Sequence, residues 1–236
     1  MKNLLLTTFL AQISFITANK SQMIQDVIKM NKLHEQSKPQ KPGERALLQA
    51  DMGLLNQYGC WCYFETDHGS GKGQPVDEID SFCKVLHDGY TCIQMDAQEK
   101  GIDCVPWEVS YNSAFGSGIP YGLSMEGLVE ECNRQNGIGT CQAWTCKVEG
   151  WFVQSYFTYS AFGGQINLAN RHENGFDTNL NCPINNGPSS DKACCGFYPL
   201  RFPYKTYNGE RGCCYGHTFN AEMNVCCEDG KSRMVC

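Results

Sequence analysis

The residues most able to do chemistry in this 236-residue chain lie between Tyr58 and Cys92. This stretch holds two cysteines separated by one residue, a glycine-rich loop, two aspartates, and His87 followed directly by Asp88. A positioned histidine can act as a general base, and carboxylate oxygens are suitable ligands for calcium. The stretch is therefore the first candidate for a catalytic or calcium-binding site.

A helix over Asp77–Cys92 is predicted to carry the histidine and the aspartate. Asp77 suits an N-cap, and apolar side chains recur along the segment at helical spacing. The segment Cys132–Phe157 is predicted to form a second long helix. Residues 101–122 are rich in glycine, serine and proline and are predicted to form a looser connection.

The cysteine content indicates an oxidising compartment. The chain has 16 cysteines, an even number that suits a disulfide framework. Residues 1–18 read as a signal peptide, with Lys2 ahead of the apolar run Leu4–Ile16 and a small-residue cleavage site at Ala18. That run is too short, and too often interrupted by polar residues, to span a bilayer. We therefore expect a secreted, extracellular protein.

The charge balance is acidic, with a formal net charge of −6. Lys2 is the only charged residue of the predicted signal peptide, so its removal makes the mature chain more acidic. An acidic chain without a basic stripe is a poor partner for nucleic acid. It is also attracted only weakly to anionic lipid surfaces.

Three parts are expected after the signal peptide at 1–18. Residues 19–57 form a lead-in with a short helix and a polar linker, residues 58–181 form one disulfide-tied unit, and residues 182–236 form a cysteine-rich module of short β-hairpins. Eight cysteines precede residue 182 and eight follow from it, so both units are expected to close their disulfides internally. The individual pairs stay open. Doublets of cysteine favour disulfides over zinc here.

The order of parts between Tyr58 and Cys92 resembles the calcium loop and active-site helix of the secreted phospholipases A2. The resemblance extends to a partner helix, where two cysteines have the spacing that the family uses. The matching positions are Tyr58-Gly59-Cys60-Trp61-Cys62, Gly71, Gly73, Pro75, Asp77, Asp80, Cys141 and Cys146.

This resemblance implies a fold, an activity and a site. The fold would have a core of two antiparallel helices, and the activity would be calcium-dependent hydrolysis of the sn-2 ester of glycerophospholipids. His87 would be the general base, Glu149 would orient its imidazole, and Asp88 would bind calcium. The other calcium ligands would be backbone carbonyls of the loop, near Trp61, Ser70 and Gly71.

The chain also departs from the family, and it does so in pairs. Phe82 and Ser155 stand where the family has the two ends of one disulfide. Gly89 and Val148 stand where it has the two ends of another. An alignment in the wrong register would not be expected to remove both cysteines of the same disulfide twice. The paired losses therefore favour an alignment to the family without gaps.

That alignment puts Leu86 in the place of the catalytic histidine and His87 in the place of the calcium-binding aspartate. Leucine cannot act as a base, and a neutral imidazole is a poor calcium ligand. A π-bulge in the helix would restore the roles of His87 and Asp88. Without it, His87 is a polar residue on a structural helix, and Asp77 and Asp80 are acids that favour a helix N-terminus.

The C-terminal segment Cys213–Gly230, CCYGHTFNAEMNVCCEDG, resembles the di-cysteine repeats of galaxin-like extracellular matrix proteins. Those repeats also place an aromatic-Asn turn between two cysteine doublets. The resemblance implies a structural module and not a catalytic one.

We therefore expect a mainly α, disulfide-rich fold, with a phospholipase A2-like core of two antiparallel helices and a small β-hairpin-like module. The expected function is that of a secreted phospholipase A2-like protein, catalytically impaired or inactive, which binds a phospholipid or membrane surface or extracellular matrix components. The alternative is an active phospholipase A2 with calcium as its cofactor. Nucleic acid is not an expected partner.

Overall fold

The computed structural model describes residues 54–64, 71–115, 123–184 and 191–236. The predicted signal peptide and almost all of the predicted lead-in lie outside these residues. The described helices, in chain order, are α4 (Glu78–Glu99), α5 (Met125–Asn136), α6 (Cys141–Ala161), the 3-10 turns η2 (Leu168–Asn170) and η3 (His172–Asn174), and α7 (Thr178–Asn181). The strands are β1 (Lys192–Cys195), β2 (Phe202–Lys205), β3 (Arg211–Cys214), β4 (His217–Asn220), β5 (Val225–Cys226) and β6 (Ser232–Arg233).

Helix α4 forms where the sequence predicts a helix and continues further. Asp77 is its N-cap, and the Asp77 carboxylate accepts a hydrogen bond from the backbone N–H of Asp80 at 3.0 Å. The helix continues beyond its predicted end because Ile93 and Ala97 extend its buried face. Gly101, with a φ of +65°, follows its last turn.

The predicted region Cys132–Phe157 does carry the second long helix, but that helix begins at Cys141, and the first residues of the region belong to α5. Helix α5 ends and α6 begins on either side of a short turn. In that turn Gly137 and Gly139 have φ values of +84° and +77°, which interrupt a right-handed helix. Thr140 then caps α6 by accepting a hydrogen bond from its first turn.

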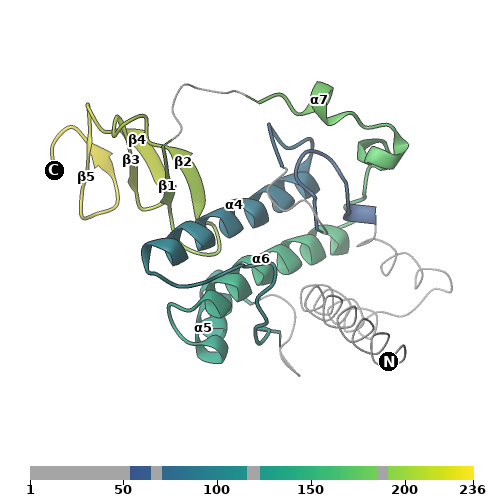
Figure 1. Cartoon of the computed structure of the whole chain (residues 1–236), viewed down its shortest axis with the longest axis horizontal. Helices are drawn as coiled ribbons and strands as arrows, with labels where there is room; N and C mark the ends of the chain where they lie inside the picture. The colour runs from purple at the N-terminus through teal and green to yellow at the C-terminus, as the bar shows by residue number, and fades with distance from the viewer. Residues whose placement is uncertain (1–53, 65–70, 116–122, 185–190) are drawn as a thin grey trace, which may run out of the picture.

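Helices α4 and α6 pack against each other and run in opposite directions (Figure 1). Near the start of α4, the Phe82 ring lies 6.0 Å from the Tyr159 ring near the end of α6. Beyond the other end of α4, the Lys100 ammonium lies 4.5 Å from the Trp144 ring near the start of α6. The fully buried side chains of the core include Leu55, Tyr58, Ile79, Leu86, Ile93, Leu128, Val148, Phe152 and Val153.

The residues after 190 form three short antiparallel hairpins, as the sequence predicts. Strand β1 pairs with β2, β3 with β4, and β5 with β6. The strands are two to four residues long and bury few side chains. Cross-links must therefore supply much of the stability of this module.

All 16 cysteines pair, and they form eight disulfides. The pairs are Cys60–Cys182, Cys62–Cys83, Cys92–Cys194, Cys104–Cys141, Cys132–Cys146, Cys195–Cys213, Cys214–Cys226 and Cys227–Cys236. This number of disulfides indicates an oxidising, extracellular type of environment. Within the described ranges, no helix is long and apolar enough to cross a membrane.

The expectation that each unit closes its own disulfides was wrong. Cys60–Cys182 and Cys92–Cys194 both join the helical part to the segment from residue 182 onward. The doublet Cys194-Cys195 explains the second case: one member reaches α4, and the other pairs within the module. Neighbouring residues on a strand point to opposite faces, so a doublet can cross-link in two directions.

Side-chain contacts add to the covalent link between the module and α4. The hydroxyl of Tyr198 donates a hydrogen bond to Asp96 on α4 at 2.8 Å. The guanidinium of Arg201 donates to the same carboxylate at 3.0 Å. The Tyr198 ring stacks on the Trp144 ring, with centroids 6.0 Å apart. The module is thus fastened to the end of α4 at several points.

Disulfide mapping tests this arrangement. Digestion of the unreduced protein is expected to release one peptide pair linked through Cys92 and Cys194, and another linked through Cys60 and Cys182. Mass spectrometry before and after reduction identifies both. The pair Cys104–Cys141, which lies within the helical part and involves no cysteine doublet, serves as the internal control. A map in which every linked peptide stays within 58–181 or within 182–236 would contradict this fold.

Candidate functional site

The buried carboxylate of Asp80 holds the loop with the two spaced cysteines against α4. Its oxygens accept hydrogen bonds from the backbone N–H groups of Cys60 at 2.8 Å, Trp61 at 2.8 Å and Val76 at 3.0 Å. Asp80 has no exposed surface. Its burial raises its pKa, and the three N–H donors act in the opposite direction. Asp80 therefore anchors two loop segments to α4. This role goes beyond that of an acid that only favours a helix N-terminus.

The backbone approaches Asp80 so closely that only glycine fits at position 59. Gly59 has a φ of +57°, and a Cβ atom there would lie 2.5 Å from the Asp80 Cγ atom. The disulfide Cys62–Cys83 ties the same loop to α4 covalently. The loop is thus held by one carboxylate and one disulfide on the same helix.

A distant segment, residues 167–176, supports this loop from the other side. The carbonyl of Asn170 accepts a hydrogen bond from the Gly59 N–H at 2.9 Å, and a ring nitrogen of His172 lies 2.8 Å from the Gly59 carbonyl. The Asn170 amide also donates to Asp77 at 2.8 Å, and the Tyr58 hydroxyl donates to the same carboxylate. Burial and this hydrogen bond raise the pKa of Tyr58. The sequence suggested no role for His172, because its partner lies more than a hundred residues away.

The predicted orienting residue, Glu149, lies at the centre of a buried hydrogen-bonded cluster. The Tyr90 hydroxyl donates to Glu149 Oε1 at 2.7 Å, and the Tyr111 hydroxyl donates to Oε2 at 2.5 Å. Only 7 % of Glu149 is exposed. Burial and the neighbouring Glu149 charge raise the pKa of Tyr90 well above its usual value. We call Tyr90, Tyr111 and Glu149 the Glu149 cluster.

His87 adjoins the Glu149 cluster through Tyr90. The two rings meet edge to face, with centroids 6.0 Å apart, and only 4 % of His87 is exposed. The sequence predicted that His87 and Glu149 share one site, and their shared neighbour is consistent with that. The sequence did not point to Tyr111, which comes from an irregular segment and has no periodic pattern to mark it.

Helix α4 is a continuous α-helix, so no π-bulge shifts His87 or Asp88. Leu86 is fully buried in the core one turn before Tyr90. A Cβ atom on Gly89 would lie 2.7 Å from a methyl group of Val148, so these two positions face each other. The resemblance paired these two positions, and the structure brings them together.

Asp88, the predicted calcium ligand, forms an ion pair with Lys84 one turn earlier on α4. The Lys84 ammonium also lies 5.0 Å from the centre of the Trp61 ring, so it bridges the aspartate and the loop. Burial raises the pKa of Asp88, while Lys84 and Lys192 act to lower it. An ammonium already neutralises the carboxylate that calcium would need.

The remaining predicted ligands are only partly described. Ser70 lies outside the described residues. Gly71 packs on the Trp61 indole, where a Cβ atom would lie 2.3 Å from a ring carbon, and the indole N–H donates to the Gly73 carbonyl at 3.2 Å. Among the described residues, no cluster of three or more His, Cys, Asp or Glu could hold a metal. These donors fit calcium poorly, and calcium stays a prediction of the resemblance alone.

Comparison with known proteins does not assign the chain to a family. No protein-family model matches it, and no solved structure matches it. Its function must therefore be inferred from the sequence pattern and from the geometry of the site.

Replacing Asp80 by Asn tests its role as the anchor of the loop. The amide can accept at one oxygen only and turns an N–H group toward a backbone donor, so the free energy of unfolding is expected to fall by about 2–3 kcal/mol. Urea unfolding with the disulfides intact measures this change. Asp103→Asn, at an exposed position, is the control and is expected to change stability little. Equal stability of the two variants would show that Asp80 does not anchor the loop.

Replacing Lys84 by Met tests the ion pair with Asp88. Removing the ammonium is expected to raise the pKa of Asp88 further, because burial then acts with less opposition. The folded-state pKa lies above the unfolded one, so the free energy of unfolding falls as the pH rises from the unfolded pKa through the folded pKa. In Lys84→Met the folded-state pKa of Asp88 is higher, so the free energy of unfolding should keep falling to a higher pH than in the unmodified protein. NMR titration of the carboxyl carbon checks it, with Lys231→Met as the exposed control. An unchanged titration of Asp88 would refute the ion pair.

Proposed function

We propose that the chain is a secreted phospholipase A2-like protein that binds a phospholipid surface without hydrolysing it. Secretion is supported by the sequence of residues 1–18 and by the eight disulfides. The family assignment is supported by the motif order from Tyr58 to Cys92, by the antiparallel pair α4 and α6, and by the facing positions Gly89 and Val148.

The regular geometry of α4 carries the proposal that hydrolysis is lost. A regular helix leaves Leu86 one turn before Tyr90, at the position that the resemblance gives to the catalytic base. It also leaves Asp88 paired with Lys84. A hydrocarbon side chain cannot take a proton from water, and a neutralised carboxylate attracts a divalent cation less strongly.

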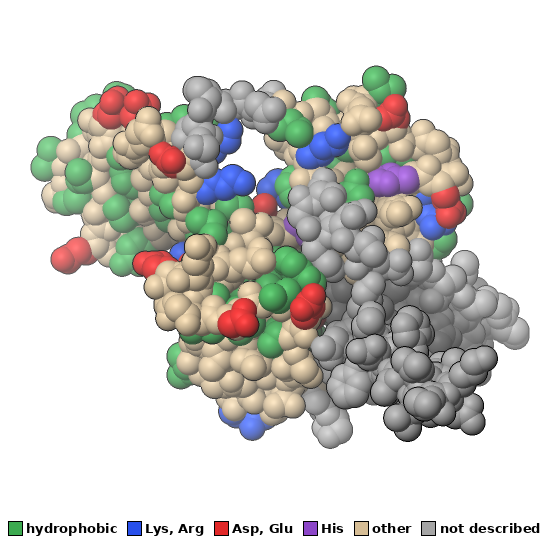
Figure 2. Space-filling view, viewed as in Figure 1, with side chains coloured by type: hydrophobic (Ala, Val, Ile, Leu, Met, Phe, Trp, Pro, Cys, Tyr) green, Lys and Arg blue, Asp and Glu red, His purple; other side chains and the backbone are tan. Residues whose placement is uncertain are grey.

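Exposed apolar side chains support binding to a lipid surface or to matrix components. Phe162, just after α6, is 89 % exposed. Figure 2 shows further apolar side chains gathered over the hairpin module on the left of the molecule. The exposed apolar residues of the module include Phe197, Leu200, Tyr215, Met223, Val225, Met234 and Val235. Apolar side chains that gather on the surface of a protein favour contact with a partner. The acidic chain favours a zwitterionic surface over an anionic one.

The alternative is an active, calcium-dependent phospholipase A2, and the Glu149 cluster favours it. His87 is buried beside Tyr90, whose hydroxyl donates to Glu149. A carboxylate held by two tyrosines next to a histidine is an environment suited to proton transfer. In this alternative His87 would take a proton from water, and Glu149 would favour the protonated imidazole.

Vesicle assays on the full, oxidised protein separate the two functions. The protein is expected to float with phosphatidylcholine vesicles and to release no fatty acid, with calcium or with chelator. His87→Gln should then leave both results unchanged. His217→Gln, at an exposed position of β4, is the matched control.

Two results would contradict this proposal. Calcium-dependent release that disappears in His87→Gln and persists in His217→Gln would establish the alternative. Failure of the folded protein to bind vesicles would remove the lipid surface as its partner.

A further inference from the structure

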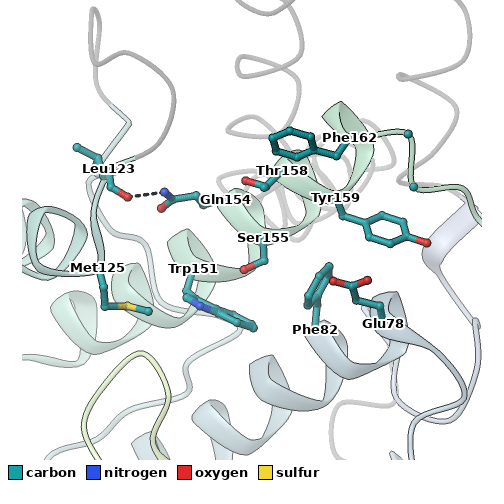
Figure 3. A pocket seen from close by; sticks show the side chains of 12 residues that line it. Glu78, Phe82, Leu123, Met125, Trp151, Gln154, Ser155, Thr158, Tyr159 and Phe162 are labelled. Carbon is teal, nitrogen blue, oxygen red and sulfur yellow. Dashed lines mark hydrogen bonds between the residues drawn. The ribbon is translucent and has the colours of Figure 1, made fainter.

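A cavity of about 680 Å³ opens between the start of α4 and the end of α6, away from the Glu149 cluster (Figure 3). Glu78 and Phe82 line it from α4, and Trp151, Ser155 and Tyr159 line it from α6. None of the residues of the Glu149 cluster lines it, and neither does His87. Phe82 and Ser155 are the two positions at which the resemblance implies a lost disulfide. A ring and a hydroxyl thus stand where a cross-link would close the space.

Three aromatic rings form adjoining walls of the cavity. The Phe82 ring stands nearly perpendicular to the Trp151 ring, at 85° with centroids 5.9 Å apart. It is also nearly perpendicular to the Tyr159 ring, at 81° with centroids 6.0 Å apart. The walls therefore present both faces and edges of rings to whatever occupies the space.

The Tyr159 wall is held in place by the chain that follows it. Gly164 packs on the Tyr159 ring so closely that a Cβ atom would lie 2.2 Å from a ring carbon. The Tyr159 hydroxyl donates a hydrogen bond to the Gln165 carbonyl at 3.2 Å. On the opposite side, the Gln154 amide donates to the Leu123 carbonyl and fixes the segment before α5 (Figure 3). An aromatic wall held in this way loses little freedom when a ligand binds.

The charge of the cavity wall is negative. Among the described residues that line the cavity, Glu78 is the one acid, and no Lys, Arg or His occurs. Glu78 is exposed, and no ion pair to it is found within the described part of the chain. The carboxylate of a fatty acid would be repelled by Glu78, and no basic residue among the described lining residues would offset that repulsion. The cavity is therefore better suited to a cation with an apolar surface.

We propose that this cavity binds a methylated ammonium group of the choline type. Such a cation is attracted to the faces of aromatic rings and to a carboxylate, and it has no N–H donors that need acceptors. The ligand could be free choline or the headgroup of a choline lipid, because the recognised chemistry is the same. Phe162, one of the exposed residues that support the proposed function, also lines this cavity, and soluble choline tests the cavity without a lipid surface.

Titration of the full, oxidised protein with choline chloride tests the site. Saturable binding is expected, followed by calorimetry or by NMR of the choline methyl groups, and ammonium chloride is expected to bind at least about tenfold more weakly. Glu78→Gln and Phe82→Leu are each expected to weaken choline binding by about fivefold or more. Glu99→Gln, which removes the same charge from the other end of α4, is the matched control and should bind choline normally. Thermal unfolding verifies that each variant is folded.

The outcomes are distinct. Absence of saturable choline binding to the folded protein would overturn the proposal, as would equal binding of ammonium and choline. Equal weakening by Glu78→Gln and Glu99→Gln would also overturn it, because net charge would then explain the effect. Choline binding that is lost only in the cavity variants supports it.

Vesicles identify the source of the ligand. If the lipid headgroup is the ligand, Glu78→Gln should weaken flotation with phosphatidylcholine vesicles, and soluble choline should compete. If free choline is the ligand, the protein binds choline, but neither Glu78→Gln nor added choline changes its flotation with the vesicles. Flotation that persists without any choline binding would refute this site and leave the proposed function intact.

Discussion

The buried carboxylate of Asp80 is the interaction on which the arrangement of the helical part depends. Three backbone N–H groups from two loop segments converge on it, and the Cys62–Cys83 disulfide brings the same loop to the same helix. A buried carboxylate needs such donors, because without them its charge would be very costly. Gly59 allows the close approach. The loop, α4 and the supporting segment 167–176 are therefore positioned together.

The hairpin module is part of the same framework and is not a detachable tail. Its strands are too short to bury a core of their own, so eight cysteines and the surface of α4 supply what it lacks. Asp96 receives both Tyr198 and Arg201, and Cys194 reaches Cys92 on the same helix. The module still exposes apolar residues, among them Tyr215, Met223, Met234 and Val235.

Two regions of the α4–α6 pair can do chemistry, and they differ in kind. The Glu149 cluster is buried, with tyrosine hydroxyls fixing both carboxylate oxygens. The cavity near Phe82 is open, aromatic and acidic. The first region suits proton transfer or simply a satisfied buried acid, and the second suits recognition of a cation. The two regions are separate, because none of the residues of the Glu149 cluster lines the cavity.

The sequence alone determined the local features of this protein. Asp77 marked the start of α4, the cysteine doublets and turn residues marked the hairpins, and the cysteine number indicated the oxidising compartment. These features depend on neighbours within a few residues, so a local pattern is enough. The break before Thr140 was missed because a glycine in a sequence allows a positive φ without requiring one, and only the structure shows that Gly137 and Gly139 both adopt it.

Only the tertiary structure decided which distant groups meet. The links from Cys60 to Cys182 and from Cys92 to Cys194, the pairing of Tyr111 with Glu149, and the contact of His172 with the loop all join segments far apart in the chain. Such contacts depend on how helices and loops pack in three dimensions, and no spacing along the sequence encodes them. The contact of Gly89 with Val148 lies between these cases: the resemblance paired these two positions, and the structure brings them together.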